Sequence, residues 1–405
     1  MTAKNRATIE LHFSDGTTIT AWKRFSWRDS FTDPLGSLEL VAHPPIDKRS
    51  DYRTRLAKGN LISLRLNNNP QATMLITTYS ETISGSGVEM KASCKSVLAT
   101  AYEGSVDPNV AQTFTADTAV SDAVLSALSL YGFDTLNTDA ANMISAMTGK
   151  ALSGQATDVI ATDLKHKDVQ ASPGEKAYPF AARIFGRLGV VLRTRNDGTL
   201  LLQKPDYEQA AAYTLLEGPK INRTGDRMLA DPGITITDTN DGQYSEVVVV
   251  GKEADKRGQK SASAPANGVQ IEGGERPDGV PFEDVALEQL PAGRHNYSSP
   301  SGASYKPLIH YDKKARDKVR ALNSAKLIMS ARASRAYQVR CAVDGFVSQT
   351  GRVWTVGTVA RVVSDSAEID ENMWILETMQ RADANGGQRT ELTLIPLHAL
   401  TLGEP

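Results

Sequence analysis

Short segments in which apolar and polar residues alternate, each bounded by a turn signal, occur at both ends of this chain. Near the start, ATIELHF and SDGTTITAW flank Ser14-Asp15-Gly16, where Gly16 can adopt the positive φ that hairpin turns need. SLELVA, NLISLRLN, ATMLITTYS and GVEMKASC continue the same period of two. This period turns one face of each strand towards a core and the other towards solvent. We therefore predict a first β-rich domain, a small barrel or sandwich, over residues 1–97.

The pattern changes after Cys94, where apolar residues recur at helical spacing in TADTAVSDAVLSALSLYGF. Thr115 or Asp117 can cap this helix. A further helix is predicted over residues 177–188, and Asn196-Asp197-Gly198 lies between two apolar runs, which is a strong hairpin signal. Residues 98–206 are therefore predicted to form a small α/β domain.

Strand patterns return in the last part of the chain. Residues 207–242 are mixed and are predicted to supply connecting strands, which can return to the first domain. A second β-rich domain is predicted over residues 243–405, with a helix at 312–333 and closing strands in VWTVGTVARVV, NMWILETMQRA and RTELTLIPL. The predicted fold class is α+β and mostly β, with two barrel or sandwich domains and the small α/β domain between them. No sequence repeat of fixed period is visible, so the likeness of the two β domains is one of architecture.

Composition gives no sign of an unusual partner. The chain has 405 residues, 40% of them hydrophobic and 23% charged, with a formal net charge of -2, which is ordinary for a soluble globular protein. The start, MTAKNRATIELHF, lacks the apolar core of a signal peptide, and the run Val247–Val250 is too short to span a bilayer. We expect synthesis in a cytoplasm, with no specific nucleic acid and no direct membrane contact.

The search for chemistry returns no catalytic, cofactor or metal residues. The GxSxG, HExxH, GxxxxGK[ST] and GxGxxG patterns do not occur in a suitable context, and the six histidines do not stand at ligand spacing from one another. Cys94 and Cys341 each lie in an apolar-alternating run, so that small buried side chains are favoured over reactive thiols. The four tryptophans lie in strand patterns and are expected in the core, with interface anchoring as the alternative.

Three functional alternatives stay open at this point. Asp365, Glu368, Asp370 and Glu371 cluster in SDSAEIDEN, but the spacing of a calcium loop is missing and a solvated turn is favoured. A glycoside hydrolase needs two facing carboxylates, and no pair stands out. The helix at 312–333 is rich in Lys and Arg, yet these are not interleaved with aromatic residues, so a solvated or subunit-facing helix is favoured over a nucleic-acid site.

The order of these pieces resembles the baseplate hub family of Mu-like contractile phages, which is related in fold to the hub half of the VgrG spike of type VI secretion. GTTITAWKRFSWRDSFTDPLGSLELVA is similar to the first segment of that family, and GNLISLRLNNNPQATMLITTYS to its next hairpin. FAARIFGRLGVVLRTRNDGTLLLQKP is similar to the middle domain. QYSEVVVVGK resembles the start of the second barrel, and GRVWTVGTVARVV with MWILETMQRADANGGQRTELTLIP resembles its end.

The resemblance covers nearly the whole chain and implies a structural protein that is not an enzyme. It implies two tube-like β domains per subunit, at 1–97 and 243–405, and a homotrimer whose pseudo-sixfold ring joins the hexameric tail tube to the trimeric central spike. The implied partners are the tail tube protein ring and the central spike protein, with the tape measure protein and the baseplate wedge as further candidates. The implied location is the tail baseplate of a virion assembled in the host cytoplasm. A tail-associated peptidoglycan hydrolase is the alternative.

The segment 252–304 departs from this resemblance. It is rich in Gly, Pro and Ser and cannot bury enough apolar surface to order itself. We predict that the short segment PFEDVALEQL docks on a neighbouring subunit or tube ring, with contacts made by Phe282, Leu287 and Leu290 and rim contacts by Arg276, Arg294 and Tyr297. A loop that folds back on its own barrel is the alternative.

Overall fold

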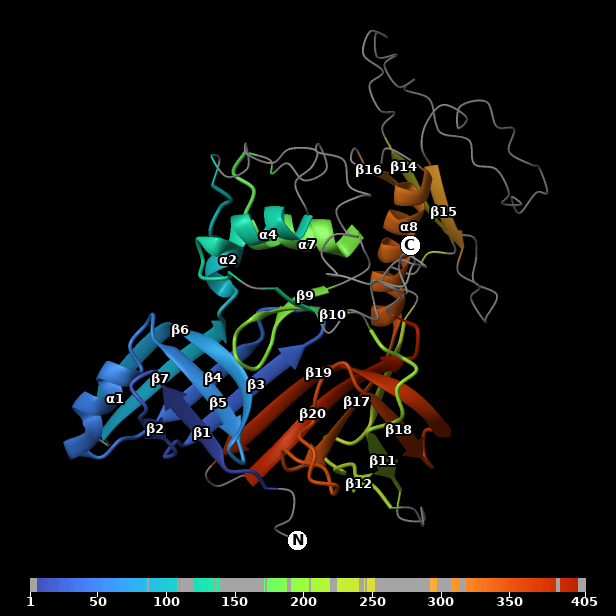
Figure 1. Cartoon of the computed structure of the whole chain (residues 1–405). Coiled ribbons are helices and arrows are strands. Elements are labelled where there is room, and N and C mark those ends of the chain that lie inside the picture. The colour runs from blue at the N-terminus through green and yellow to red at the C-terminus, as the bar shows by residue number, and fades with distance from the viewer. Residues whose placement is uncertain are drawn as a thin grey trace, which may run out of the picture. The chain divides into compact units, whose positions relative to one another are not determined.

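The computed structural model describes residues 6–85, 87–107, 109, 120–134, 136–138, 171, 173–187, 191–203, 205–218, 224–239, 244, 246–251, 292–296, 307–312, 318–383 and 387–399. These residues are mostly β, as the sequence predicts (Figure 1). The chain divides into two compact units, and each is described by itself. The main unit comprises Met1–Ile184, Val191–Thr237 and Gln338–His398, and the inserted unit comprises Phe185–Val190, Asp238–Tyr337 and Ala399–Pro405.

The first seven strands form one antiparallel part of the main sheet, which we call the first module. Its strand order is β3-β4-β7-β6-β5-β1-β2. The predicted hairpin at Gly16 is confirmed, because β1 pairs with β2 and Gly16 has a φ of +79°. The elements are β1 (Ile9–Phe13), β2 (Thr18–Ile19), β3 (Arg24–Ser30), β4 (Ser37–Ala42), the short helices η2 (Ile46–Lys48) and α1 (Arg49–Arg55), β5 (Leu61–Leu66), β6 (Asn69–Ser84) and β7 (Gly87–Ser96).

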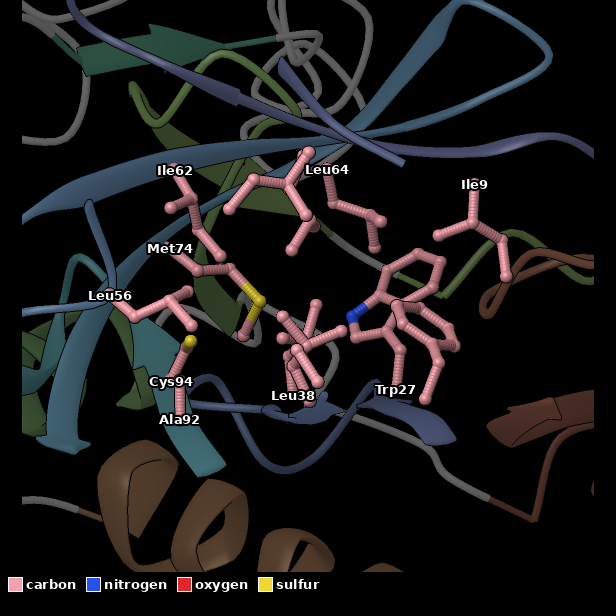
Figure 2. Packing of buried hydrophobic residues seen from close by; sticks show 14 of the residues in the cluster. Ile9, Trp27, Leu38, Leu56, Ile62, Leu64, Met74, Ala92 and Cys94 are labelled. Carbon is pink, nitrogen blue, oxygen red and sulfur yellow. The ribbon is translucent and has the colours of Figure 1, made fainter. Parts of the chain in front are cut away.

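The core of the first module is built by the inward residues of these alternating strands. Figure 2 shows Ile62, Leu64 and Met74 from β5 and β6 facing Leu38 and Trp27 from β4 and β3. Each side chain that alternation points inward removes its apolar surface from water, and this burial is the main force that holds the strands together.

Helices and a three-stranded sheet lie in the middle of the chain, where the sequence predicts a small α/β domain, and the extent of that domain stays a prediction. Its sheet has the order β8-β10-β9, in which β10 is parallel to β8 and antiparallel to β9. The predicted hairpin is confirmed, since Gly198 connects β9 and β10 with a φ of +88°. The capping residues Thr115 and Asp117 lie outside the described residues. The elements are α2 (Ala99–Glu103), α4 (Val120–Ser129), β8 (Leu136–Thr138), α7 (Ala177–Arg187), β9 (Val191–Thr194) and β10 (Leu200–Gln203).

The later strands of the main unit form a second module whose strand pairing makes a closed circuit. From β11 the pairing runs through β18, β19 and β20 to β17. It returns through the Met228–Val343 bridge to β12, which pairs with β11. The strands are β11 (Tyr213–Glu217), β12 (Asp226–Arg227), β13 (Thr235–Asp238), β17 (Tyr337–Asp344), β18 (Val359–Ser364), β19 (Ile369–Asp383) and β20 (Gly387–Pro396).

Aromatic residues fill the second module. Trp354 and Trp374 are fully buried, as the sequence favours, and Trp354 stacks on Tyr213 with ring centroids 4.5 Å apart. Residues 207–242 supply β11, β12 and β13, which pair with β18 and β17 of this module. The domain boundaries at 97, 206 and 242 stay predictions.

In its described residues the inserted unit has a three-stranded sheet covered by one helix. Its strand order is β15-β14-β16, with β14 (Glu246–Gly251) antiparallel to β15 (Ala292–Asn296) and parallel to β16 (Pro307–Asp312). The predicted helix at 312–333 is found as α8 (Lys318–Ala336), while residues 313–317 lie outside the described part. Val247 and Val249 of the sheet pack against one face of α8, formed by Ala321, Ala325 and Met329.

A membrane span is not found in the helices that the structure describes, because none of them is both long and apolar enough.

Candidate interaction surface

The two modules of the main unit are joined by one pair of antiparallel strands, β3 and β19. Seven residues of β19, Glu377–Asp383, pair with β3, from Glu377 opposite Ser30 to Asp383 opposite Arg24. The sheet therefore runs without a break from the first module into the second (Figure 1). We call this junction the seam.

One side of the seam is packed as a hydrophobic core. Ala382 of β19 is 4% exposed and belongs to the same buried cluster as Trp27 and Phe25 of β3. Phe346 of the second module also joins this cluster, with its ring centroid 5.9 Å from that of Phe25. Because side chains of both modules share this core, the seam is a structural junction and not a loose contact.

Gln380 is an exception on this packed side. It lies opposite Trp27, is fully buried, and its amide nitrogen and oxygen find no hydrogen-bond partner among the described residues. A buried amide without partners costs stability, so this position is not optimised for the folding of the seam. We have no physical account of its presence.

The other side of the seam is polar and carries one ion pair between the modules. Arg28 of β3 donates to Glu377 Oε2 at 2.8 Å and to Asp33 Oδ2 at 3.0 Å. The hydrogen bond to Glu377 is the main cause that raises the pKa of the Arg28 guanidinium. The pair therefore links β3 to β19 through a charge-assisted hydrogen bond at the sheet surface.

Further contacts connect parts of the main unit that are far apart in the sequence. Ala7 and Gln388 exchange two hydrogen bonds, from the Ala7 amide at 2.8 Å and from Gln388 Nε2 at 2.6 Å. The edge of the Phe31 ring meets the Trp374 ring, with centroids 4.5 Å apart. The hairpin β9–β10 contacts β3 through Arg193, whose guanidinium lies 2.6 Å from Asp29 Oδ1.

The two modules repeat the same strand pairing residue by residue. In the first, β6 and β7 pair Ile76 with Cys94, then shift by a bulge so that Thr78 pairs with Ser93. In the second, β19 and β20 pair Ile375 with Leu394, then shift by a bulge so that Glu377 pairs with Thr393. Both hairpins close on a glycine with positive φ, Gly87 and Gly387. β6 therefore corresponds to β19, and β7 to β20.

The strands beside these hairpins correspond as well. β4 pairs with β7 as β17 pairs with β20, with Leu38 opposite Cys94 and Val339 opposite Leu394. β5 pairs with β6 as β18 pairs with β19, with Ile62 opposite Met74 and Ala360 opposite Met373. This repeat is absent from the sequence as a visible period, because different residue types meet the same burial requirement at equivalent positions.

Of the six interface residues predicted in segment 252–304, the structure describes only Arg294. Arg276, Phe282, Leu287, Leu290 and Tyr297 lie outside the described residues. Arg294 lies in β15, opposite Val248 of β14 in the same chain. Docking of this segment on a neighbour therefore stays a prediction. Residues 292–296 form a strand that pairs with β14 of the same chain.

The acidic cluster at 365–371 forms a turn and the start of a strand, as the sequence favours. Residues 365–368 connect β18 to β19, and Asp370 accepts a hydrogen bond from Arg361 at 2.9 Å. Glu217 accepts hydrogen bonds from the Ser364 and Ser366 hydroxyls, which lower the pKa of its carboxyl. Within the described part of the chain, His, Cys, Asp and Glu side chains do not form a group of three or more that could hold a metal ion.

A carboxyl with a raised pKa is what acid catalysis needs, and Asp226 has one because it is buried. Its carboxylate accepts the Gln349 amide at 2.8 Å inside the wall of the second module. A hollow lies beside the hairpin β9–β10, and its lining includes the carboxylates of Asp29 and Asp197. Asp29 accepts a hydrogen bond from Arg193, and hydrogen bonds from Thr199 lower the pKa of Asp197. Asp226 does not line this hollow.

Both cysteines are buried and unpaired with each other, as favoured from their apolar context. Burial raises the pKa of the Cys94 thiol and of the Cys341 thiol to about 12. At neutral pH each therefore stays a protonated, apolar side chain.

The seam and the repeated register are the features that sequence reasoning missed. The available signal was the pair of long alternating segments at 69–84 and 369–383, each followed by a Gly-containing turn and a second alternating segment. Which strand lies beside which cannot be deduced from alternation, because every amphipathic strand has the same period.

Comparison with known proteins finds one family match and several solved structures of similar fold. Residues 315–403 match the family described as Mu phage baseplate assembly protein GpP, fourth domain. No curated protein sequence matches the chain significantly. The tail protein from Neisseria meningitidis MC58 has 15% identity and a TM-score of 0.71, with 98% of this chain and 99% of that chain covered.

Two further solved structures share the fold. The 43 kDa tail protein of prophage MuSo2 from Shewanella oneidensis has 15% identity and a TM-score of 0.69, covering 97% of this chain and 99% of that one. The E. coli c3393 protein, described as a component of the type VI secretion system, has 9% identity and a TM-score of 0.50, covering 98% and 79%. The family match confirms the resemblance to a Mu phage baseplate assembly protein for residues 315–403, and the solved structures show that the chain as a whole shares the fold of these tail proteins.

Proposed function

We propose that this protein is the structural hub of a contractile tail baseplate, and that three copies form a pseudo-sixfold ring between the hexameric tail tube and the trimeric central spike. The observation that carries the proposal is the seam. Two β modules with the same strand register are joined side by side in one chain through β3 and β19. The match to a baseplate assembly protein family and the likeness to tail proteins support the same role.

The physical argument concerns symmetry. Three copies of a chain with two similar modules present six similar modules to a partner on one side, while the chain itself repeats only three times. A sixfold tube ring can then contact six equivalent surfaces, and a threefold spike can contact the features that differ between the modules. Closed rings of this kind also remove exposed sheet edges, which are otherwise prone to uncontrolled pairing.

The finer assignments belong to the same proposal. The two modules act as tube-like domains, with the α/β unit of residues 98–206 between them in the chain. The partners are the tail tube ring and the central spike, with the tape measure protein and the baseplate wedge as further candidates. The protein acts through assembly and not through catalysis, in the virion baseplate.

The test is the mass of the full chain in solution and its position in the particle. Light scattering after size exclusion is expected to give three chains per particle, and electron microscopy of tails labelled on this chain is expected to place it at the tube end next to the spike. A strictly monomeric protein that never joins the tube or the spike contradicts the proposal. Zymography on bacterial cell walls examines the alternative, and lysis by the isolated chain would establish a hydrolase.

A further inference from the structure

We propose that Thr78–Ile83 of β6 pairs with β13 of a second copy of this chain, antiparallel and in the register that joins β19 to β3 within one chain. The pairing rests on the proposed function for the number of copies in the ring. Its position and register come from the repeat inside the main unit, and these can be tested separately.

The first step is that β13 corresponds to β3. β3 pairs with β4, and β13 pairs with β17, the strand that corresponds to β4. The segment around β13 runs antiparallel to β17, since Met228 bridges Val343 and the Thr239 amide donates to the Ala336 carbonyl. If the register of the Thr239–Ala336 hydrogen bond is continued back along β13, Ile236 lies opposite Val339. Trp27 lies opposite Leu38, the equivalent of Val339, so Ile236 takes the place of Trp27.

The second step is that β6 and β13, which correspond to the seam strands β19 and β3, each have an edge that no described strand covers. The outer edge of β19 is covered by β18 over its first half and by β3 from Glu377 onward. The outer edge of β6 is covered by β5 up to Leu75. Beyond that point, strand pairs among the described residues leave Thr78–Ile83 and the outer side of β13 without a partner strand.

The third step is the difference in burial at equivalent positions. Ile83 is 74% exposed, whereas its equivalent in the seam, Ala382, is 4% exposed. Ile236 is 40% exposed, whereas its equivalent, Trp27, is 6% exposed. Large apolar side chains at the exact places where the seam buries its own are what a partner strand would cover. A long open edge with an exposed isoleucine is otherwise an aggregation hazard.

The register then decides which residues meet. Met379 lies opposite Arg28 in the seam, and Arg381 lies opposite Ser26. The equivalent contacts between two copies set Ser80 opposite Thr237 and Thr82 opposite Thr235. Facing hydroxyl and β-branched residues stabilise antiparallel strands.

One apolar pair also forms in this register. Ala382 lies opposite Phe25 in the seam, so Ile83 faces Ile234 of the second copy. The side chain of Glu81 lies opposite Ile236, but it is already neutralised by two hydrogen bonds from Arg53 on α1 of its own chain. No like charges therefore lie directly opposite each other in this pairing.

The two edges are different surfaces of the same chain, so the contact is head to tail. A head-to-tail contact uses β6 of one copy and β13 of the next, and it closes into a ring when the rotation permits. The seam within each chain and the contact between chains then alternate around the ring, with the same strand geometry at each.

Cysteine cross-linking tests the register. We expect oxidation of the full chain carrying Ser80→Cys with Thr237→Cys, or Thr82→Cys with Thr235→Cys, to give covalent oligomers up to the trimer on a non-reducing gel. The shifted pair Thr78→Cys with Thr235→Cys is the control and is expected to give none, because its partners are four residues out of register. The native Cys94 and Cys341 are buried and do not interfere.

A matched pair of surface variants tests the edge without cysteine chemistry. Ile83→Lys is expected to raise the protein concentration at which light scattering detects the trimer by at least tenfold. Ile46→Lys is expected to leave that concentration unchanged. Ile46 is 79% exposed and lies in η2, outside both edge strands. Thermal unfolding of each variant at low concentration shows that both remain folded.

The outcomes separate the two proposals. A trimer that cross-links in neither designed pair, or that tolerates Ile83→Lys, overturns the edge pairing and leaves the hub proposal standing. A chain that is monomeric both in solution and in the particle overturns both. Cross-linking in the designed pairs, with loss of the trimer in Ile83→Lys alone, supports the pairing.

Discussion

The hairpins β6–β7 and β19–β20 share a bulge at the equivalent position and a closing glycine with positive φ. They differ at the outer edge of their first strand, which a described strand covers beyond the bulge in β19 but not in β6. From its bulge onward β19 is covered by β3, and its Thr378, Gln380 and Ala382 are buried. The equivalent stretch of β6 is half-buried or exposed. Exposure on β6 is therefore not a property of this kind of hairpin. It marks a place where, in the part of the chain that the structure describes, the repeated architecture has a partner strand in one module and none in the other.

The strands that face these hairpins differ in a second way. β3 and β4 are linked directly by residues 31–36, whereas β13 and β17 are separated by residues 239–336, which contain the sheet and helix of the inserted unit. An insertion at a hairpin turn keeps strand pairing intact, because only the loop-closure entropy changes and it grows slowly with length. The second module therefore keeps the strand register of the first despite the added unit.

The largest expected effect comes from placing a charge at equivalent positions of the two hairpins. Ala382→Asp buries an unpaired carboxylate in the seam and is expected to lower the free energy of unfolding by about 3–5 kcal/mol. Ile83→Asp is expected to change that of the dilute monomer by less than about 0.5 kcal/mol, because the site is exposed there. Urea unfolding of both variants measures the difference. Equal effects at the two sites would mean that β6 is covered within one chain.

A smaller effect is expected at the two cysteines, which occupy core positions of the two modules. Cys94→Ser and Cys341→Ser each place a hydroxyl in an apolar site and are expected to cost about 1–3 kcal/mol. Chemical denaturation of the two variants gives the comparison. A loss confined to one module would contradict the equivalence of the cores.

The same thiols give a pH dependence with a definite sign. Burial raises the pKa of each thiol from its ordinary value of 9.0 to about 12 in the folded chain. Their contribution to stability is therefore complete below pH 9 and is lost as the pH rises from 9 towards 12. We expect the wild-type chain to lose stability over this range more steeply than the double Cys→Ser variant. A thiol reagent at pH 8 is expected to label neither cysteine until the chain unfolds.

The smallest expected effect is at the ion pair across the seam. Glu377→Gln removes the charge that Arg28 contacts and is expected to cost about 0.5–1 kcal/mol, since both side chains are partly exposed and solvent screens them. The control is Asp370→Asn, which weakens the more exposed pair with Arg361 inside the second module and is expected to cost less. The difference should shrink in high salt. A cost above 2 kcal/mol would show that the ion pair, and not the apolar core, holds the seam.

Several elements could be predicted from local sequence because their causes are local. Gly16 and Gly198 take the positive φ that their hairpins require, and helix α7 follows its apolar spacing. The buried tryptophans and cysteines follow from alternation. Helix α8 ends later than predicted, at Ala336, because a helix end depends on what the last turn packs against.

The candidate site could not be predicted in the same way. The contact residues predicted in segment 252–304 follow from composition, which indicates that a segment needs an outside partner but not which one. The open edges at Thr78–Ile83 and Thr235–Asp238 carry no unusual composition. They are defined by the absence of a partner strand among the described residues, and this is a property of the whole sheet.

The sequence by itself determined the mostly β fold class, the turns, the buried faces of the strands and the resemblance to baseplate hub proteins. The turns and buried faces follow from the period of two and from glycine at positive φ, which act over a few residues. The resemblance follows from the order of the segments, which can be seen along the sequence without knowing how the strands pair. Only the tertiary structure decided that β3 joins β19, that the two modules share one register, and that no other described strand covers the outer edges of Thr78–Ile83 and β13. Strand pairing is non-local, and any amphipathic strand can satisfy its period beside many others. The choice among them is made by the packing of Trp27, Phe25, Ala382 and Phe346 in a common core.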